Sequence, residues 1–101
     1  MEKKTIEIKG HLDSAPVVVP MGNRTMVFIV LSVDSYLPPK HPTLLKMYAV
    51  FPNDAAAAVD SFQTSMIFSR EKDFVVVTAR TDERGWAKSE ILSFKNRTRG
   101  L

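Results

Sequence analysis

The stretch "TLLKMYAVFPNDAAAAVDSFQ" (residues 43–63) changes its periodicity half-way, and that change decides the fold. Residues 43–51 alternate as a strand does, and one face of that strand is wholly apolar: Leu45, Met47, Ala49 and Phe51. Residues 52–63 indicate a helix, because Asn53 or Asp54 can cap it and four alanines, the strongest helix formers, follow. The sequence therefore predicts a strand that leads directly into a short helix.

Strand patterns also occur on both sides of this stretch, in residues 4–12, 25–37, 73–81 and 86–94. Within the first of them, Gly10 indicates a bulge or a sharp bend, since glycine weakens an ordinary strand interior. Residues 13–25, rich in proline and glycine, indicate a turn, with Gly22 and Asn23 as its centre. Residues 64–73 remain open between a short strand at "SMIF" and a turn.

The order of these elements is strand, strand, strand, helix, strand, strand. This order is typical of the OB-fold, a small Greek-key barrel of five strands. The sequence thus predicts the all-β class with one short helix, in the order β-β-β-α-β-β. A chain of 101 residues fits one domain, 1–101, in which residues 95–101 are expected to form a short basic tail.

Several stretches resemble the bacterial single-stranded DNA-binding protein family, including its shorter primosomal replication members. "IEIKGHLDSAPVVVPMGNRTMVFIVLSV" matches the family's opening pattern of a glycine, a proline, a glycine and an inward phenylalanine, here Gly10, Pro16, Gly22 and Phe28. "YAVFPNDAAAAVDSF", "DFVVVTAR" and "KSEILSF" resemble the strand and helix that follow and the last two strands. The chain departs from the pattern at Lys72 and Ala79, where the family usually has glycines. The resemblance implies an OB-fold and binding of single-stranded DNA.

The composition limits the classes of protein that fit. With 45% hydrophobic and 25% charged residues, the chain has the composition of a globular protein, and its net charge of +3 is mildly basic. The absence of cysteine excludes disulfides, zinc-thiolate sites and thiol nucleophiles. Residues 1–10 lack the apolar region of a signal peptide, and no apolar run approaches the ~20 residues of a membrane span. We therefore expect a cytoplasmic protein without a membrane partner.

Catalytic patterns are absent from the sequence. His11 and His41 are the two histidines, and neither belongs to a cluster with the spacing of metal ligands. The sequence also has no nucleophile elbow and no phosphate-binding loop. We expect no enzyme activity, no cofactor, no metal and no small-molecule substrate.

Single-strand binding requires positive charges that follow the phosphates and aromatic faces on which bases stack. Eight residues on expected non-core faces or in loops meet this need: Tyr36, Lys40, Lys46, Tyr48, Arg80, Arg84, Trp86 and Lys88. Alternatively, Tyr48 and Trp86 pack against the barrel. The basic residues Arg80, Arg84 and Lys88 would then be solvent-facing charges that keep a sheet edge from aggregating. Asp82 and Glu83 lie between the two arginines, where they would repel phosphate.

A further set of apolar side chains is expected on an exposed face: Val27, Ile29, Leu31, Phe74 and Val76. A small barrel does not leave so much apolar surface in water, so this set predicts a homodimer or a higher homo-oligomer. The alternative is that the helix or the N-terminal arm covers this face.

The sequence as a whole predicts a non-catalytic single-stranded DNA-binding protein, in replication, restart or a mobile element. The alternative is an OB-fold subunit for protein–protein interaction without nucleic-acid binding.

Overall fold

The computed structural model describes residues 4–33, 43–53, 62–82 and 85–100 of the chain. Its elements are β1 (Lys4–Leu12), β2 (Val17–Met21), β3 (Arg24–Val33), β4 (Thr43–Pro52), α2 (Gln63–Ile67), β5 (Phe74–Asp82) and β6 (Gly85–Asn96). Within these residues no helix has the length and apolar character needed to cross a membrane.

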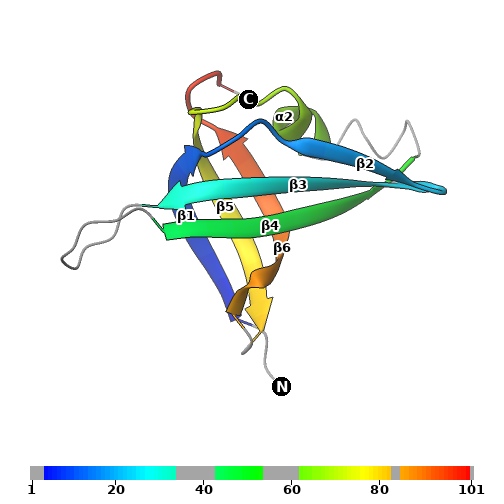
Figure 1. Cartoon of the computed structure of the whole chain (residues 1–101), viewed down its shortest axis with the longest axis horizontal. Coiled ribbons are helices and arrows are strands. Elements are labelled where there is room, and N and C mark those ends of the chain that lie inside the picture. Colours follow the sequence, from blue (N-terminus) through cyan, green and yellow to red (C-terminus); the bar gives the residue numbers. More distant parts are fainter. Residues whose placement is uncertain (1–3, 34–42, 54–61, 83–84, 101) are drawn as a thin grey trace.

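The strands form a closed barrel (Figure 1). Their order is β1-β5-β6-β4-β3-β2, and a pairing between β1 and β3 closes five of them into a ring. All neighbours are antiparallel except β4 and β6, which pair in parallel through two residue pairs, Met47 with Ser89 and Tyr48 with Glu90. A five-stranded Greek-key barrel with a helix between β4 and β5 is the OB-fold, so the predicted fold class is confirmed.

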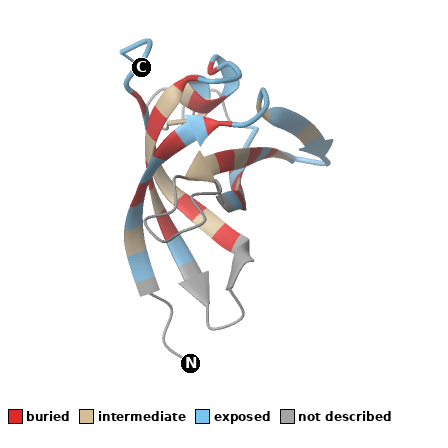
Figure 2. Cartoon of the chain, turned by 60° about the vertical axis from the view of Figure 1, so that its left-hand side comes forward, coloured by how far each residue is buried: buried red, intermediate tan, exposed pale blue. Residues whose placement is uncertain are grey.

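Strand alternation builds the core of the barrel. Along β4 the predicted face, Leu45 to Phe51 in alternate positions, is buried, while Lys46 and Val50 are exposed (Figure 2). Along β3 the inner positions are Val27, Ile29 and Leu31, at most 2% exposed.

The prediction that Val27, Ile29 and Leu31 form an oligomer interface is therefore wrong, because these side chains fill the barrel. The outer face of β3 carries Met26, Phe28 and Val30 instead. Phe28 is 41% exposed, so the resemblance-based expectation of an inward phenylalanine is also wrong.

Strand β2 was missed by the sequence prediction, which assigned residues 13–25 to a turn. Its five residues pair with β3 from Val17 opposite Phe28 to Met21 opposite Arg24. Pro20 is tolerated because β2 is the terminal strand of the sheet, where one side of the backbone has no ladder to complete. The predicted turn is confirmed at its centre, where Gly22 has φ +61°, a conformation that glycine adopts freely.

Of the two features predicted at Gly10, a bulge or a sharp bend, the bulge is wrong. The register between β1 and β5 runs without a break from Lys4 to His11, and β1 also meets β3 where His11 lies opposite Ser32. A Cβ atom on Gly10 would lie 2.8 Å from the carbonyl oxygen of Ser32. Glycine is required here because the backbones of β1 and β3 approach closely where the barrel closes.

The predicted helix at residues 52–63 differs at its start. Pro52 belongs to β4, and Asn53 stabilises the β2–β3 turn: its backbone N–H donates to the carbonyl of Asn23, 3.0 Å, and its Oδ1 accepts from the Thr25 hydroxyl, 2.6 Å. Residues 54–61, which include the alanine run, lie outside the described residues. The "SMIF" segment is helical up to Ile67 and is not a strand.

Helix α2 closes the end of the barrel at which the C-terminus lies (Figure 1). The side chain of Met66, from the helix itself, is fully buried in the core of the barrel. Just before the helix, Phe62 packs edge-on against Phe51 with 5.2 Å between ring centroids. Aromatic pairs in this geometry add about 0.5–1.5 kcal/mol to the burial of their surface.

A buried polar cluster joins the C-terminal residues to the turn before β5. The Oδ2 atom of Asp73 accepts hydrogen bonds from the Arg70 backbone N–H (2.9 Å), the Asn96 amide (2.9 Å) and the Arg99 Nε (2.6 Å). The Asn96 amide also donates to the Ser69 hydroxyl, 2.8 Å. Burial would raise the pKa of Asp73, but these donors outweigh it and lower the pKa to about 2. We call Ser69, Asp73, Asn96 and Arg99 the C-terminal clasp.

The clasp changes the interpretation of residues 95–101 as a basic tail. Strand β6 continues to Asn96, two residues into the predicted tail. Beyond it, Arg97 N–H donates to the Phe74 carbonyl (2.9 Å), and the Thr98 hydroxyl accepts from Phe74 N–H (2.8 Å). These bonds hold residues 97–100 against the beginning of β5.

Candidate nucleic-acid interface

Three of the eight predicted binding residues have described side chains. Lys46 and Tyr48 lie on the outer face of β4, exposed and half-buried respectively, and Arg80 is exposed on β5. Trp86 and Lys88 lie in β6, but their side chains are outside the described part of the chain. Tyr36, Lys40 and Arg84 lie outside the described residues altogether.

The sheet register brings two of these three residues into one row across the barrel. Tyr48 lies opposite Phe28 of β3 on one side and opposite Glu90 of β6 on the other, and Glu90 in turn lies opposite Arg80. Neighbouring strands are about 4.8 Å apart, so the row crosses four strands in roughly 15 Å. Lys46 lies one position outside the row, opposite Val30.

Phe28 and Tyr48 form the aromatic part of the row. They are direct cross-strand neighbours, whose Cβ atoms lie about 4.5–5.5 Å apart on one face of a sheet. Both rings emerge on the outer face, because the positions on either side of each are buried. The pair is an exposed aromatic surface with Lys46 beside it. Sequence reasoning missed Phe28 because β3 is apolar on both faces, so its alternation does not show which face is inside.

Glu90 places a carboxylate inside the same row. It lies between Tyr48 and Arg80 and is half-buried. A carboxylate at this position opposes a phosphate that would otherwise be attracted to Arg80. Sequence reasoning missed it because the contact depends on the parallel register between β4 and β6, which no local pattern encodes.

An apolar surface adjoins the aromatic pair on β2 and β4. Val17 lies opposite Phe28, and it is 56% exposed. Met21 on β2 and Val50 on β4 are also at least 40% exposed, whereas Val18 lies opposite Val27 and so belongs to the other face of β2. Phe74 and Val76, predicted to be part of an interface, are half-buried on β5, on the outer side of the β1–β5–β6 part of the barrel.

The described residues contain no group of three or more histidine, aspartate or glutamate side chains that could hold a metal ion. The chemistry that this part of the surface offers is stacking on aromatic rings and attraction or repulsion of charge. Both are properties of a binding surface.

The fold and this surface together define an OB-fold barrel with an exposed aromatic pair. Among solved structures, the chain is similar to a small single-stranded DNA-binding protein from Streptomyces coelicolor, with 17% identity, a TM-score of 0.60, and 95% of this chain and 94% of that chain covered. It is also similar to the second single-stranded DNA-binding protein from Mycobacterium smegmatis, with 11% identity, a TM-score of 0.63, and coverage of 95% and 90%. At these identities the likeness shows the fold. The sequence matches no protein-family model and no curated protein.

Proposed function

We propose that this chain is a non-catalytic protein that binds single-stranded DNA. The observation that carries the proposal is the exposed pair of Phe28 and Tyr48, with Lys46 beside it, on an OB-fold barrel. The similar solved structures belong to proteins described as binding single-stranded DNA, which supports the same ligand here. Replication, replication restart or a mobile element is the setting in which we expect it, in the cytoplasm.

Stacking is the main source of affinity in this proposal. Bases stack on the rings of Phe28 and Tyr48, each worth about 1–3 kcal/mol, and Lys46 and Arg80 attract the flanking phosphates. The other predicted residues extend the path beyond the row: Tyr36, Lys40, Arg84, Trp86 and Lys88. Glu90 limits affinity because its charge opposes the phosphate nearest Arg80.

Two variants test the row in opposite directions. Tyr48→Ala is expected to weaken binding to labelled oligo-dT by about 5- to 150-fold, the loss that corresponds to one stacked base. Glu90→Gln is expected to tighten it, because the substitution removes the opposing charge. Fluorescence anisotropy at low salt measures both affinities.

The matched control for Glu90→Gln is Glu71→Gln, since Glu71 is exposed in the turn before β5. Both substitutions raise the net charge equally, so a stronger effect at Glu90 reports its position in the row. Binding that does not respond to Tyr48→Ala, or an absence of binding at micromolar protein, would overturn the proposal.

The exposed β2 strand favours a second function, contact between protein chains. β2 is the terminal strand of the sheet, it carries no charge, and Val17, Val18 and Met21 are 56%, 44% and 52% exposed. An uncharged apolar edge strand is a template for pairing with another strand, and the missing N–H of Pro20 confines that pairing to Val17, Val18 and Val19. We propose a second copy of this chain as its partner, because two antiparallel copies of β2 oppose no like charges.

A further inference from the structure

A second cationic surface lies on the outer face of β1, β5 and β6, away from the Phe28–Tyr48 pair. Lys9 of β1 and Lys95 of β6 lie opposite the same residue of β5, Val76, one from each side. Both lysines are exposed. They are therefore separated by two strand spacings, about 10 Å, with an apolar side chain between them.

The next row toward the C-terminal end repeats this arrangement. His11 of β1 lies opposite Phe74 of β5, and their rings are 5.2 Å apart at a tilt of 57°. On the other side of Phe74, its carbonyl accepts from the Arg97 N–H at 2.9 Å, which places Arg97 beside it. His11 and Arg97 are exposed and Phe74 is half-buried.

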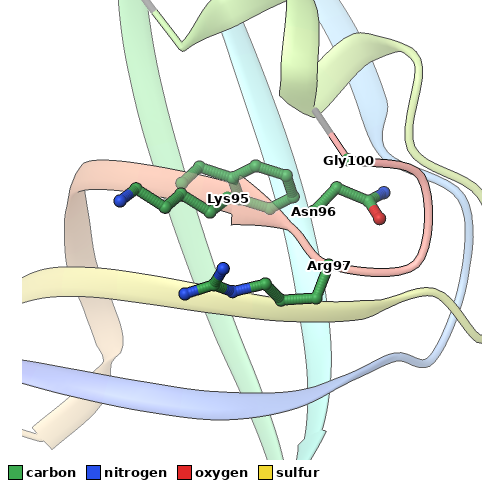
Figure 3. Close-up of a pocket in the computed structure, with 5 residues that line it drawn as sticks. Lys95, Asn96, Arg97 and Gly100 are labelled. Atoms are coloured by element: carbon green, nitrogen blue, oxygen red, sulfur yellow. The ribbon is translucent and has the colours of Figure 1, made fainter.

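Together these residues form two basic borders around an apolar floor. We call Lys9, His11, Phe74, Val76, Lys95 and Arg97 the second face. On the β6 side, Lys95 and Arg97 extend in the same direction while Asn96 points the other way (Figure 3). These three residues, with Phe94 and Gly100, line a hollow of about 370 Å³. Two cations that reach toward one side of a strand can neutralise neighbouring phosphates of one chain.

The carboxylates near this surface leave it with a positive net charge. The Asp73 carboxylate, next to Phe74 in the chain, is buried and paired with Arg99 at 2.6 Å. Glu7 is exposed two residues from Lys9 on the same outer face of β1, opposite Thr78, so it borders the second face on the side toward Arg80 and offsets part of its charge. The second face therefore has an excess of positive charge, in contrast to the row that contains Glu90.

This charge also decides against a contact between two copies at Phe74 and Val76. A two-fold contact centred on these residues would bring lysines and arginines of one copy against those of the other. Like charges across an interface cost several kcal/mol. A polyanion that lays phosphates along the borders and bases over Phe74 gains from the same arrangement.

We propose that the second face binds a continuation of the same single strand that stacks on Phe28 and Tyr48. This inference rests on the proposed function. β5 connects the two sites, because Arg80 ends the first row and Val76 lies four residues away on the same outer face. That separation is about 14 Å along a strand, so a longer oligonucleotide can occupy both sites and a short one only the first.

The test compares oligo-dT of about 6 and about 16 nucleotides, the range of site sizes of OB-folds, in anisotropy titrations at several salt concentrations. Lys9→Gln/Lys95→Gln is expected to weaken binding of the longer oligonucleotide about tenfold at low salt and to leave the shorter one unchanged. Removing two phosphate contacts also lowers the slope of log affinity against log salt by about 1.4.

The control is Arg70→Gln/Lys72→Gln, which removes two exposed charges from the turn before β5. Three results would overturn the proposal for the second face. The two double variants could weaken binding equally, the Lys9/Lys95 variant could lose the same affinity for both oligonucleotides, or it could lose none. The proposed function still stands in each of those outcomes if the wild-type protein binds the short oligonucleotide and the Tyr48→Ala variant does not. If the wild-type protein binds neither oligonucleotide, the proposed function itself fails.

Discussion

Lys72 adopts a backbone conformation that suits glycine. Its φ is +72°, and its N–H donates to the Leu12 carbonyl at 2.8 Å, which fixes the turn before β5 against the end of β1. This is the position where the resembled family usually has a glycine. A residue with a Cβ atom loses about 1–2 kcal/mol in the left-handed region, so the chain is strained at this residue.

Lys72→Gly is expected to raise the free energy of unfolding by about 0.5–1 kcal/mol, because the relief of strain exceeds the added freedom of the unfolded chain. Urea denaturation measures the change. The neighbouring substitution Glu71→Gly is the control: it adds the same freedom at a position without positive φ, and it should destabilise. If both substitutions destabilise equally, Lys72 is not strained.

At the scale of single residues, the sequence predicted orientation where only one face of a strand is apolar. The alternation of Lys46 and Tyr48 with buried neighbours on β4 was predictable, and the structure confirms it. On β3 both faces are apolar, so the pattern contained no information about which side faces the barrel. Phe28 and Ile29 were therefore assigned to the wrong sides.

The C-terminal clasp links three elements that local patterns treat separately. Asp73 precedes β5, Asn96 ends β6 and Ser69 follows α2, and all three are at most 4% exposed. Removing one partner of such a buried network leaves a buried polar atom without one of its hydrogen bonds, which is costly. The clasp therefore stabilises the end of the barrel that α2 covers.

The clasp makes stability depend on pH in the acid range. The pKa of Asp73 is about 2 in the folded chain, below its usual 3.8, so its contribution is present above about pH 4 and is lost as the pH falls toward 2. Asp73→Asn is expected to lower the free energy of unfolding at pH 7 by about 2–3 kcal/mol. It should also flatten the decline between pH 5 and pH 2.

Urea denaturation at a series of pH values measures both effects. Arg99→Gln, which removes one donor but keeps the carboxylate, should reduce the slope only in part. An Asp73→Asn variant with the wild-type pH dependence would show that the clasp does not contribute in this way.

At the scale of elements, the strands were predicted where composition and alternation agree, and β2 was missed where they conflict. Its Pro20 and the flanking glycine indicate a turn, and an edge strand tolerates both. Whether a strand lies at an edge is a property of the complete sheet. Likewise, Asn53 is of a residue type that is common at helix caps, and it forms hydrogen bonds to the β2–β3 turn, a contact between distant parts of the sequence.

For the molecule as a whole, the exposed edge of β2 predicts self-association. Multi-angle light scattering at micromolar concentrations should give a mass above the 11.3 kDa of one chain. Val18→Lys should restore the single-chain mass, because a lysine on an edge strand prevents pairing. Ile67→Lys on α2 makes the same change at another exposed apolar residue and should leave the mass unchanged. A single-chain mass for the wild type favours a different protein as the partner of β2.

The order of elements was enough to predict the closed barrel, since few folds place one helix between the third and fourth of five strands. The composition of the row around Tyr48 was not predictable to the same degree. Lys46 and Tyr48 follow from one strand, whereas Glu90 joins them only when β6 pairs with β4. Sites built across two strands depend on register, and register is set by the complete sheet.

The parallel pairing of β4 with β6 joins the two antiparallel parts of the barrel, β1–β5–β6 and β4–β3–β2, and it consists of two residue pairs from distant parts of the sequence. Contacts of such large sequence separation slow folding, since the intervening chain must first lose its freedom. Tyr48 and Glu90 face each other across this seam. An oligonucleotide bound over both strands would therefore stabilise the folded barrel against unfolding. The rate of unfolding would then depend on the concentration of the oligonucleotide.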